Sequence, residues 1–128
     1  MKLLLDTHAL IWFLNDHSSL SPRAKSVIEH PETESFVSIA SLWEIAIKMN
    51  LGKLDLGAPF ETLFPAQLEL NGFIQLPVNI EHLYVLERLP SHHRDPFDRL
   101  LIAQAQVEGL TLVSCDPHFY AYGSTLLW

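Results

Sequence analysis

Short apolar runs alternate with longer helix-like segments along this chain, and this alternation constrains the fold more than any other feature. The runs lie at residues 3–5, 35–38, 73–76 and 110–114, and a short run at 125–127 would form an edge strand. Apolar periodicity predicts helices at residues 7–14, 22–30, 39–51, 59–71, 80–89 and 96–108. Strands separated by helices pair in parallel through crossovers. The sequence therefore predicts an α/β protein, built as a three-layer α/β/α sandwich.

The composition favours one globular domain spanning residues 1–128. Hydrophobic residues make up 48 % of the chain, enough for a substantial core. Charged residues make up only 18 %, below the usual ~25 %. Because so little of the surface is charged, we expect another protein to cover part of it, and we favour a homodimer.

Charge, cysteine content and hydropathy narrow the function classes. The net charge of −7 argues against a broad basic surface for nucleic acid, unless a bound metal offsets the acidic residues. A single cysteine, Cys115, cannot form an internal disulfide, which fits a reducing compartment. No apolar stretch approaches the ~20 residues needed to span a bilayer. We therefore expect a cytoplasmic protein with no membrane partner.

Four acidic residues stand out: Asp6, Asp98 and Asp116, which lie after an apolar run or in the first turn of a helix, and Glu44, which lies inside an apolar helix. In an open α/β sheet, ligands bind in the crevice beyond the carboxyl ends of the strands. Carboxylates gathered there would repel one another by about 4 kcal/mol per pair at ~4 Å and an effective dielectric of ~20. Hard divalent cations prefer oxygen ligands. The pattern predicts a Mg²⁺ or Mn²⁺ site.

Each acid also has a purely structural interpretation. Asp6 and Asp116 each follow a strand and precede a helical turn, so both could be N-caps. Glu44 shares a narrow stripe of its otherwise apolar helix with Ala40, Ser41 and Lys48, and it could simply pair with Lys48. Asp98 begins an inward-facing row, whereas Asp95, directly before Pro96, is the better helix cap.

Other polar residues are weaker candidates. Lys48 and Arg99 could hold a phosphate backbone, although ordinary surface pairing explains them equally well. His92 and His93 lie in a predicted loop, where we expect them to be solvated rather than bound to zinc. Cys115 has no partner for metal binding, and we expect it to be a small buried residue beside the site.

Four segments of the chain together resemble the motifs of PIN-domain ribonucleases, and among these the VapC-type toxins of prokaryotic toxin–antitoxin pairs. They are residues 3–12 (LLLDTHALIW), 38–45 (SIASLWEI), 93–103 (HRDPFDRLLIA) and 112–119 (LVSCDPHF). The resemblance implies a five-stranded parallel sheet in the order 3-2-1-4-5. It assigns Asp6, Glu44, Asp98 and Asp116 as the catalytic metal ligands, and Ser114 fills the place of a hydroxyl residue that is typical two positions before the fourth acid.

The resemblance implies a metal-dependent endoribonuclease that hydrolyses RNA phosphodiester bonds as the toxin of a toxin–antitoxin pair. The expected cofactor is Mg²⁺ or Mn²⁺, and the expected partners are RNA, an antitoxin protein and a second copy of the chain. One alternative is an inactive PIN-like protein-binding module that keeps the acids as helix caps. Another is a phosphotransfer domain that forms an aspartyl-phosphate on Asp6. His8 stands where a phosphatase of that kind would have a second acid, which counts against it.

Overall fold

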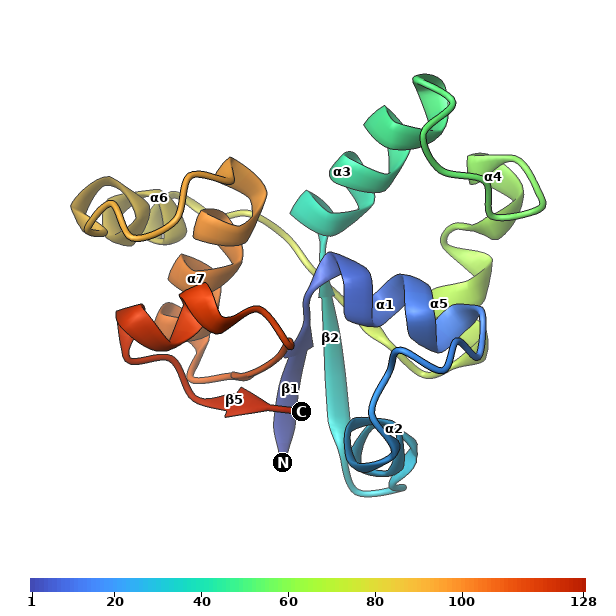
Figure 1. Cartoon of the computed structure of the whole chain (residues 1–128), viewed down its shortest axis with the longest axis horizontal. Helices are drawn as coiled ribbons and strands as arrows, with labels where there is room; N and C mark the ends of the chain where they lie inside the picture. Colours follow the sequence, from blue (N-terminus) through green and yellow to red (C-terminus); the bar gives the residue numbers. More distant parts are fainter.

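The computed structural model describes residues 1–128 and contains one five-stranded sheet in the order β3-β2-β1-β4-β5 (Figure 1). All four pairs of neighbouring strands are parallel. The strands are β1 (Lys2–Leu5), β2 (Glu34–Ser38), β3 (Ile74–Leu76), β4 (Thr111–Val113) and β5 (Leu126–Leu127). The predicted α/β class and the strand order 3-2-1-4-5 are both confirmed.

Strand β1 lies at the centre of the sheet, where its three leucines are fully buried. Leu3 and Leu5 pack into one hydrophobic cluster and Leu4 into the other, because successive side chains of a strand point to opposite faces. A run of three leucines is therefore the sequence of a strand that is covered on both faces.

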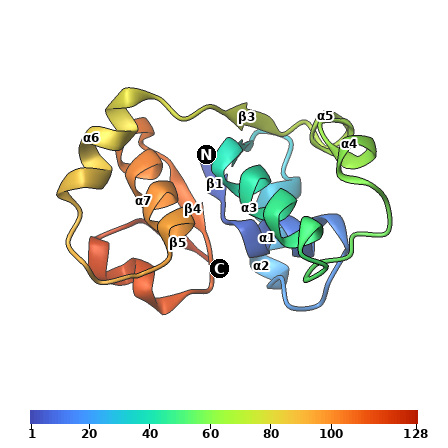
Figure 2. The ribbon, with the colours of Figure 1, turned by 90° about the horizontal axis from the view of Figure 1, so that it is seen from above.

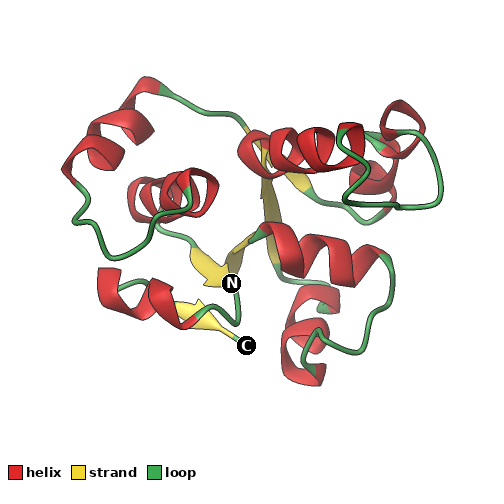
Figure 3. Ribbon diagram, turned by 45° about the horizontal axis from the view of Figure 1, so that its top comes forward, coloured by secondary structure: helices red, strands yellow, loops and turns green.

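Helices cover both faces of the sheet, which gives the expected three layers (Figures 1 and 2). One layer holds α1 (Thr7–Leu14), α2 (Pro22–Glu29), α3 (Ile39–Asn50), α4 (Phe60–Leu63) and α5 (Ala66–Leu70). The other holds α6 (Ile80–Arg88), α7 (Pro96–Glu108) and the 3-10 helix η1 (Pro117–Tyr122). Figure 3 shows the strands lying between these two groups of helices.

The prediction of one helix over residues 59–71 is wrong, because two short helices, α4 and α5, occupy this segment. The backbone is extended at Phe64, with φ −123° and ψ 132°. Pro65 follows it, and a proline inside a helix removes a hydrogen bond and clashes with the preceding turn. The break at this point lets Phe64 pack into the core.

The longest helix, α7, has 13 residues, and no helix is both long and apolar enough to cross a bilayer.

Parallel pairing places the carboxyl ends of β1, β2 and β4 at the same edge of the sheet. Helices α1 and α3 start there, directly after β1 and β2 (Figure 1). The Asp6 N–H donates to the Val113 carbonyl at 3.1 Å, which ties the end of β1 to the end of β4. This edge is where an α/β sheet places its ligand crevice.

Candidate active site

Asp6 and Asp116 follow two neighbouring strands, and each caps the helix after it. The Ala9 N–H donates to Asp6 Oδ1 at 2.7 Å, at the start of α1. The His118 N–H donates to Asp116 Oδ1 at 2.9 Å, at the start of η1. The capping interpretation is therefore correct for both residues. It uses only one oxygen of each carboxylate, so it does not exclude a second role.

Glu44 is buried on α3, although the charged residues of a helix usually face water and its apolar residues face the core. Its exposed fraction is 6 %, whereas the neighbouring Trp43 is 60 % exposed. Ser41, one turn earlier, is also buried, and its hydroxyl accepts a hydrogen bond from Thr7 of α1 at 3.1 Å. The polar stripe predicted from the sequence thus faces the protein and the end of β1 rather than water. The predicted ion pair is also present, with Lys48 Nζ 2.8 Å from Glu44 Oε2.

Asp98 lies in the first turn of α7, in the electric field of the other acids. Burial raises its pKa most, and the charges of Asp95, Asp6, Glu44 and Asp116 raise it further, to about 8. Asp95 caps α7, as predicted, accepting from the Phe97 N–H at 2.8 Å and the Asp98 N–H at 3.2 Å. The other three predicted site acids therefore lie near enough to act electrostatically on the carboxyl group of Asp98.

The environments of Asp6 and Asp116 push their pKa values in opposite directions. Burial raises the pKa of Asp6, against the opposing effects of the Ser114 hydroxyl and the Ala9 N–H. Burial also raises the pKa of Asp116, but hydrogen bonds from His118 and His93 outweigh it and leave the pKa of Asp116 below its usual value. At neutral pH, Asp116 is the more firmly ionised of the two.

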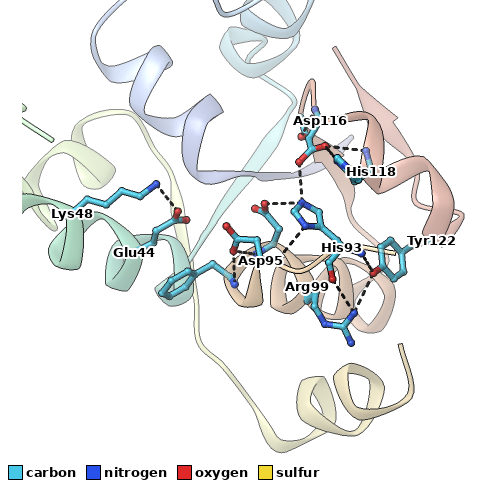
Figure 4. A network of polar contacts seen from close by, with 11 residues as sticks. Glu44, Lys48, His93, Asp95, Arg99, Asp116, His118 and Tyr122 are labelled. Carbon is cyan, nitrogen blue, oxygen red and sulfur yellow. Dashed lines mark hydrogen bonds and ion pairs between the residues drawn. The ribbon is translucent and has the colours of Figure 1, made fainter. Parts of the chain in front are cut away.

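The four carboxylates lie near one another without closing on a single point. No three of them offer oxygens that all lie within 4.8 Å of one another. Figure 4 shows Glu44 and Lys48 on α3 to one side, and His93, Asp116 and His118 on the other. Mg²⁺ commonly keeps several waters and uses only one or two carboxylates directly. Mutually repelling oxygen donors at this spacing, two of them buried and two partly exposed, fit such a cation.

The prediction that His93 is solvated is wrong. Its side chain is 13 % exposed, and Nε2 lies 3.0 Å from Asp116 Oδ2 and 3.1 Å from Asp98 Oδ2. His118 was not singled out from the sequence, yet its Nδ1 lies 2.8 Å from Asp116 Oδ1. The one available signal was its position two residues after a capping aspartate, where a side chain can turn back to the cap.

The structure gives three other predicted residues definite surroundings. The Ser114 hydroxyl is buried next to Asp6 and accepts from the Asp116 N–H at 3.1 Å. Arg99 turns its guanidinium to the loop before α7, donating to the Pro90 carbonyl at 2.9 Å. The phosphate-binding roles of Arg99 and Lys48 stay predictions.

Cys115 is exposed, so the expectation of a buried cysteine is wrong. Neighbouring side chains in an extended segment point in opposite directions, and the buried Ser114 takes the inward position.

Comparisons with known proteins agree with this architecture. The family model described as "PIN domain" matches residues 3–124. A comparison with curated protein sequences finds no match.

Among solved structures, VapBC2 from Rickettsia felis bound to a promoter DNA fragment matches with a TM-score of 0.74 and 15 % identity, covering 99 % of this chain and 98 % of that one. VapC20 from Mycobacterium tuberculosis, described as a Sarcin-Ricin loop cleaving toxin, matches with a TM-score of 0.68 and 17 % identity, covering 96 % of each chain. FitAcB from Neisseria gonorrhoeae matches with a TM-score of 0.64 and 18 % identity, covering 98 % and 96 %.

At sequence identities of 15–18 %, the structural matches support the fold and nothing further. The family match extends over nearly the whole chain and includes all four site acids. The motif resemblance, the strand order and the family model agree: the chain belongs to the PIN-domain family.

Proposed function

We propose that this protein is a metal-dependent endoribonuclease of the VapC type, acting as the toxin of a toxin–antitoxin pair. The proposal assigns Asp6, Glu44, Asp98 and Asp116 to a Mg²⁺ or Mn²⁺ site and RNA as the substrate. It is supported by the family, by the buried acids at the strand ends, and by similarity to toxins of which one is described as cleaving the Sarcin-Ricin loop.

The gathering of four other acids around the partly buried carboxyl group of Asp98 is the observation that carries the proposal. A carboxyl group shifted to about 8 by burial and by four neighbouring acids lies in a site with excess negative charge. Such a group is destabilising unless a cation or a proton neutralises it. A divalent oxygen-binding cation would neutralise several of these carboxylates at once.

Two of the acids separate this proposal from the helix-cap alternative. Asp6 and Asp116 cap helices, so a binding module without a metal would also keep them. Glu44 lies in the middle of α3, and the cap of α7 is Asp95 rather than Asp98. A helix cap explains neither carboxylate. Glu44 has Lys48 as a partner, but a cation site would account for both acids together.

The aspartyl-phosphate alternative fits the structure poorly. Asp6 is buried, and its Oδ1 accepts the capping hydrogen bond from Ala9 at 2.7 Å. Burial also raises the pKa of Asp6, which favours the protonated form. A nucleophilic carboxylate has to be ionised and reachable by the phosphoryl donor.

In the proposed reaction, a divalent cation would act as a Lewis acid and neutralise charge on the scissile phosphate. Asp6 and Asp116, fixed by their caps at two adjacent strand ends, hold their free oxygens at a set position. Glu44 or Asp98 takes the proton from the attacking water.

Lys48 and Arg99 are the proposed phosphate contacts. Lys48 is the stronger candidate, because its ammonium group lies on the site side of α3, paired with Glu44 and partly exposed. A phosphate could replace or extend that pair. Arg99 would first have to leave its contacts in the loop before α7.

An antitoxin partner and a homodimer belong to the same proposal. A cavity of about 320 Å³ between α3 and the α4–α5 segment is lined mostly by apolar side chains, including Trp43, Phe60 and Phe64. It adjoins the helix that carries Glu44. A partner with apolar side chains for this cavity and a basic side chain for the acids would block the site. The proposed place of action, where RNA is available, is the cytoplasm.

RNA cleavage tests the proposal. Transfer, ribosomal and messenger RNAs would be incubated with the protein in Mg²⁺, Mn²⁺ or EDTA, and the cut sites mapped. We expect cleavage with either cation and none in EDTA. Glu44→Gln should reduce the rate at least about 100-fold, since losing an outer contact to a metal ligand alone commonly costs 10–100-fold. Asp95→Asn, which keeps a good helix cap, is the matched control and should cleave normally. Cleavage in EDTA, or an unchanged rate in Glu44→Gln, would refute the proposal.

A further inference from the structure

The loop before α7 is fastened to the protein by two side chains, Arg99 and Tyr122 (Figure 4). The Arg99 guanidinium donates to the Pro90 carbonyl at 2.9 Å, the Tyr122 hydroxyl at 3.2 Å and the Leu89 carbonyl at 3.3 Å. The His93 N–H donates to the same hydroxyl at 2.8 Å, and the His93 carbonyl accepts from Arg99 at 3.4 Å. Both polar backbone groups of His93 are therefore held in place.

The ring of His93 is fixed as well, and its surroundings determine which nitrogen carries the proton. Nδ1 lies 3.2 Å from the Asp95 backbone nitrogen, and a backbone N–H can only donate. Nδ1 is therefore the acceptor, and in the neutral imidazole the proton lies on Nε2. The ring also packs against Phe119, at 5.9 Å between ring centroids.

The protonated Nε2 faces two of the four site acids. It lies 3.0 Å from Asp116 Oδ2 and 3.1 Å from Asp98 Oδ2. These two carboxylates come from different elements, one after β4 and the other in the first turn of α7. Nε2–H hydrogen-bonds to Asp116 and lies in close polar contact with Asp98, so a single N–H group lies between two parts of the site that no backbone hydrogen bond joins.

The protonation of the His93 ring also argues against a zinc site formed by His93, Asp116 and His118. The ligand atoms of His93, Asp116 and His118 lie within 4.8 Å of one another, a donor set that would suit zinc. A histidine binds a metal through an unprotonated nitrogen. Because Nε2 of His93 carries the proton and Nδ1 accepts from Asp95, neither nitrogen is free to do so.

We infer that His93 is a positioning residue of the proposed active site, which ties Asp98 to Asp116 through its Nε2–H while Arg99 and Tyr122 fix its backbone. The inference rests on the proposed function, since those two acids are proposed cation ligands. Donors behind metal ligands orient them, and their loss typically lowers metal affinity or activity by about 10–100-fold. His93 touches the ligands and not the substrate, so its effect should appear first in cation binding.

Two substitutions test the roles of the two ring nitrogens separately. In His93→Asn, the side-chain oxygen lies near the position of Nδ1 and still accepts from the Asp95 N–H, but no donor reaches the carboxylates. In His93→Gln, the amide nitrogen lies near the position of Nε2 and restores that donor. We expect Mn²⁺ affinity, measured by calorimetry, to fall about 10–100-fold in His93→Asn and to return to within about threefold of the unaltered protein in His93→Gln.

The thermal midpoint in EDTA is the control for folding, because Asn keeps the acceptor that holds the loop. We expect it to stay near that of the unaltered protein in His93→Asn. Unchanged or tighter Mn²⁺ binding by His93→Asn would overturn the inference. Equal losses in the Asn and Gln variants would also overturn it, because the donor at the Nε2 position would then not be what matters.

Nitrogen-15 NMR of the His93 ring separates this inference from the proposed function. We expect a protonated Nε2 and an unprotonated Nδ1 in the cation-free protein at pH 8, and a proton on Nδ1 would overturn the inference. Failure of the unaltered protein to bind Mn²⁺ or to cleave RNA would instead refute the proposed function, and the NMR result would still report the state of His93.

Discussion

Replacing Asp98 by Asn should stabilise the cation-free protein. The pKa of Asp98 is raised from 3.8 to about 8 in the folded protein, by burial first and then by the charges of Asp95, Asp6, Glu44 and Asp116. Between these two values, the unfolded chain releases the proton and the folded protein keeps it. Raising the pH over this range therefore favours the unfolded state. An asparagine is always neutral and carries no such cost.

The magnitude follows from the same shift. A pH of 7 is about 3 units above the pKa of Asp98 in the unfolded chain. At ~1.36 kcal/mol per unit, the raised pKa lowers the free energy of unfolding by about 4 kcal/mol at this pH. This is an upper limit, because 20 % of the side chain stays exposed and water there screens the charges. We expect Asp98→Asn to raise the free energy of unfolding by about 2–4 kcal/mol at pH 7. The gain should vanish near pH 4 and level off above about pH 8, the pKa of Asp98 in the folded protein.

Urea denaturation of both proteins in EDTA at pH 4.5, 7 and 8.5 measures this difference. Saturating Mn²⁺ provides a second comparison, since a ligand at ~100 times its dissociation constant stabilises the folded state by ~2.7 kcal/mol. We expect Mn²⁺ to stabilise the unaltered protein and to have little effect on Asp98→Asn. The reasoning is wrong if Asp98→Asn is no more stable than the unaltered protein in EDTA at pH 7, or if its advantage does not grow with pH.

Three further substitutions test separate parts of the structure. Asp6→Asn should lose Mn²⁺ binding, but its stability should hardly change because Asn still accepts from the Ala9 N–H. Asp6→Ala lacks this acceptor and should be about 1 kcal/mol less stable than Asp6→Asn. Equal stability of the two variants in urea would count against the cap. Lysine in Arg99→Lys cannot donate from two nitrogens to the Pro90 and Leu89 carbonyls, so hydrogen exchange at the His93 amide should become faster. Unchanged exchange together with weaker RNA binding would favour a phosphate-binding role for Arg99 instead. Buried Gln104 accepts a hydrogen bond from Ser38 at 2.5 Å and donates to the Pro77 carbonyl at 3.2 Å. Gln104→Leu removes both contacts and should destabilise the fold by about 1–3 kcal/mol. A thermal midpoint that does not fall would contradict this.

The sheet and most helices could be predicted because the local sequence signals and the global fold agree. The three leucines of β1 have the composition of a strand covered on both faces, and the structure buries all three. Ser21-Pro22 and Asp95-Pro96 each start a helix where a cap and a first-turn proline predict one. Pro65 was the exception, because the apolar pattern of residues 59–71 continued across a residue that cannot continue a helix.

The candidate site could be predicted in outline, but its internal contacts could not. The position of Glu44 among small and polar residues on α3 indicated that this stripe faces either water or a site, and the structure buries it. The prediction for His93 failed because its surroundings include Asp116, 23 residues away after β4, as well as its near neighbours Asp95 and Asp98. Periodicity carries no information on such long-range contacts. Cys115 is exposed because the neighbouring Ser114 takes the buried position in this extended segment.

Binding of Mn²⁺ tests the claim on which the whole account depends, that carboxylates from distant segments form one cation site. Calorimetry at pH 8 would compare the unaltered protein with Asp6→Asn, Glu44→Gln and the control Asp95→Asn. The account predicts saturable binding by the unaltered protein and by Asp95→Asn, and its loss in the other two. Equal binding by all four proteins, or none by the unaltered protein, would contradict it.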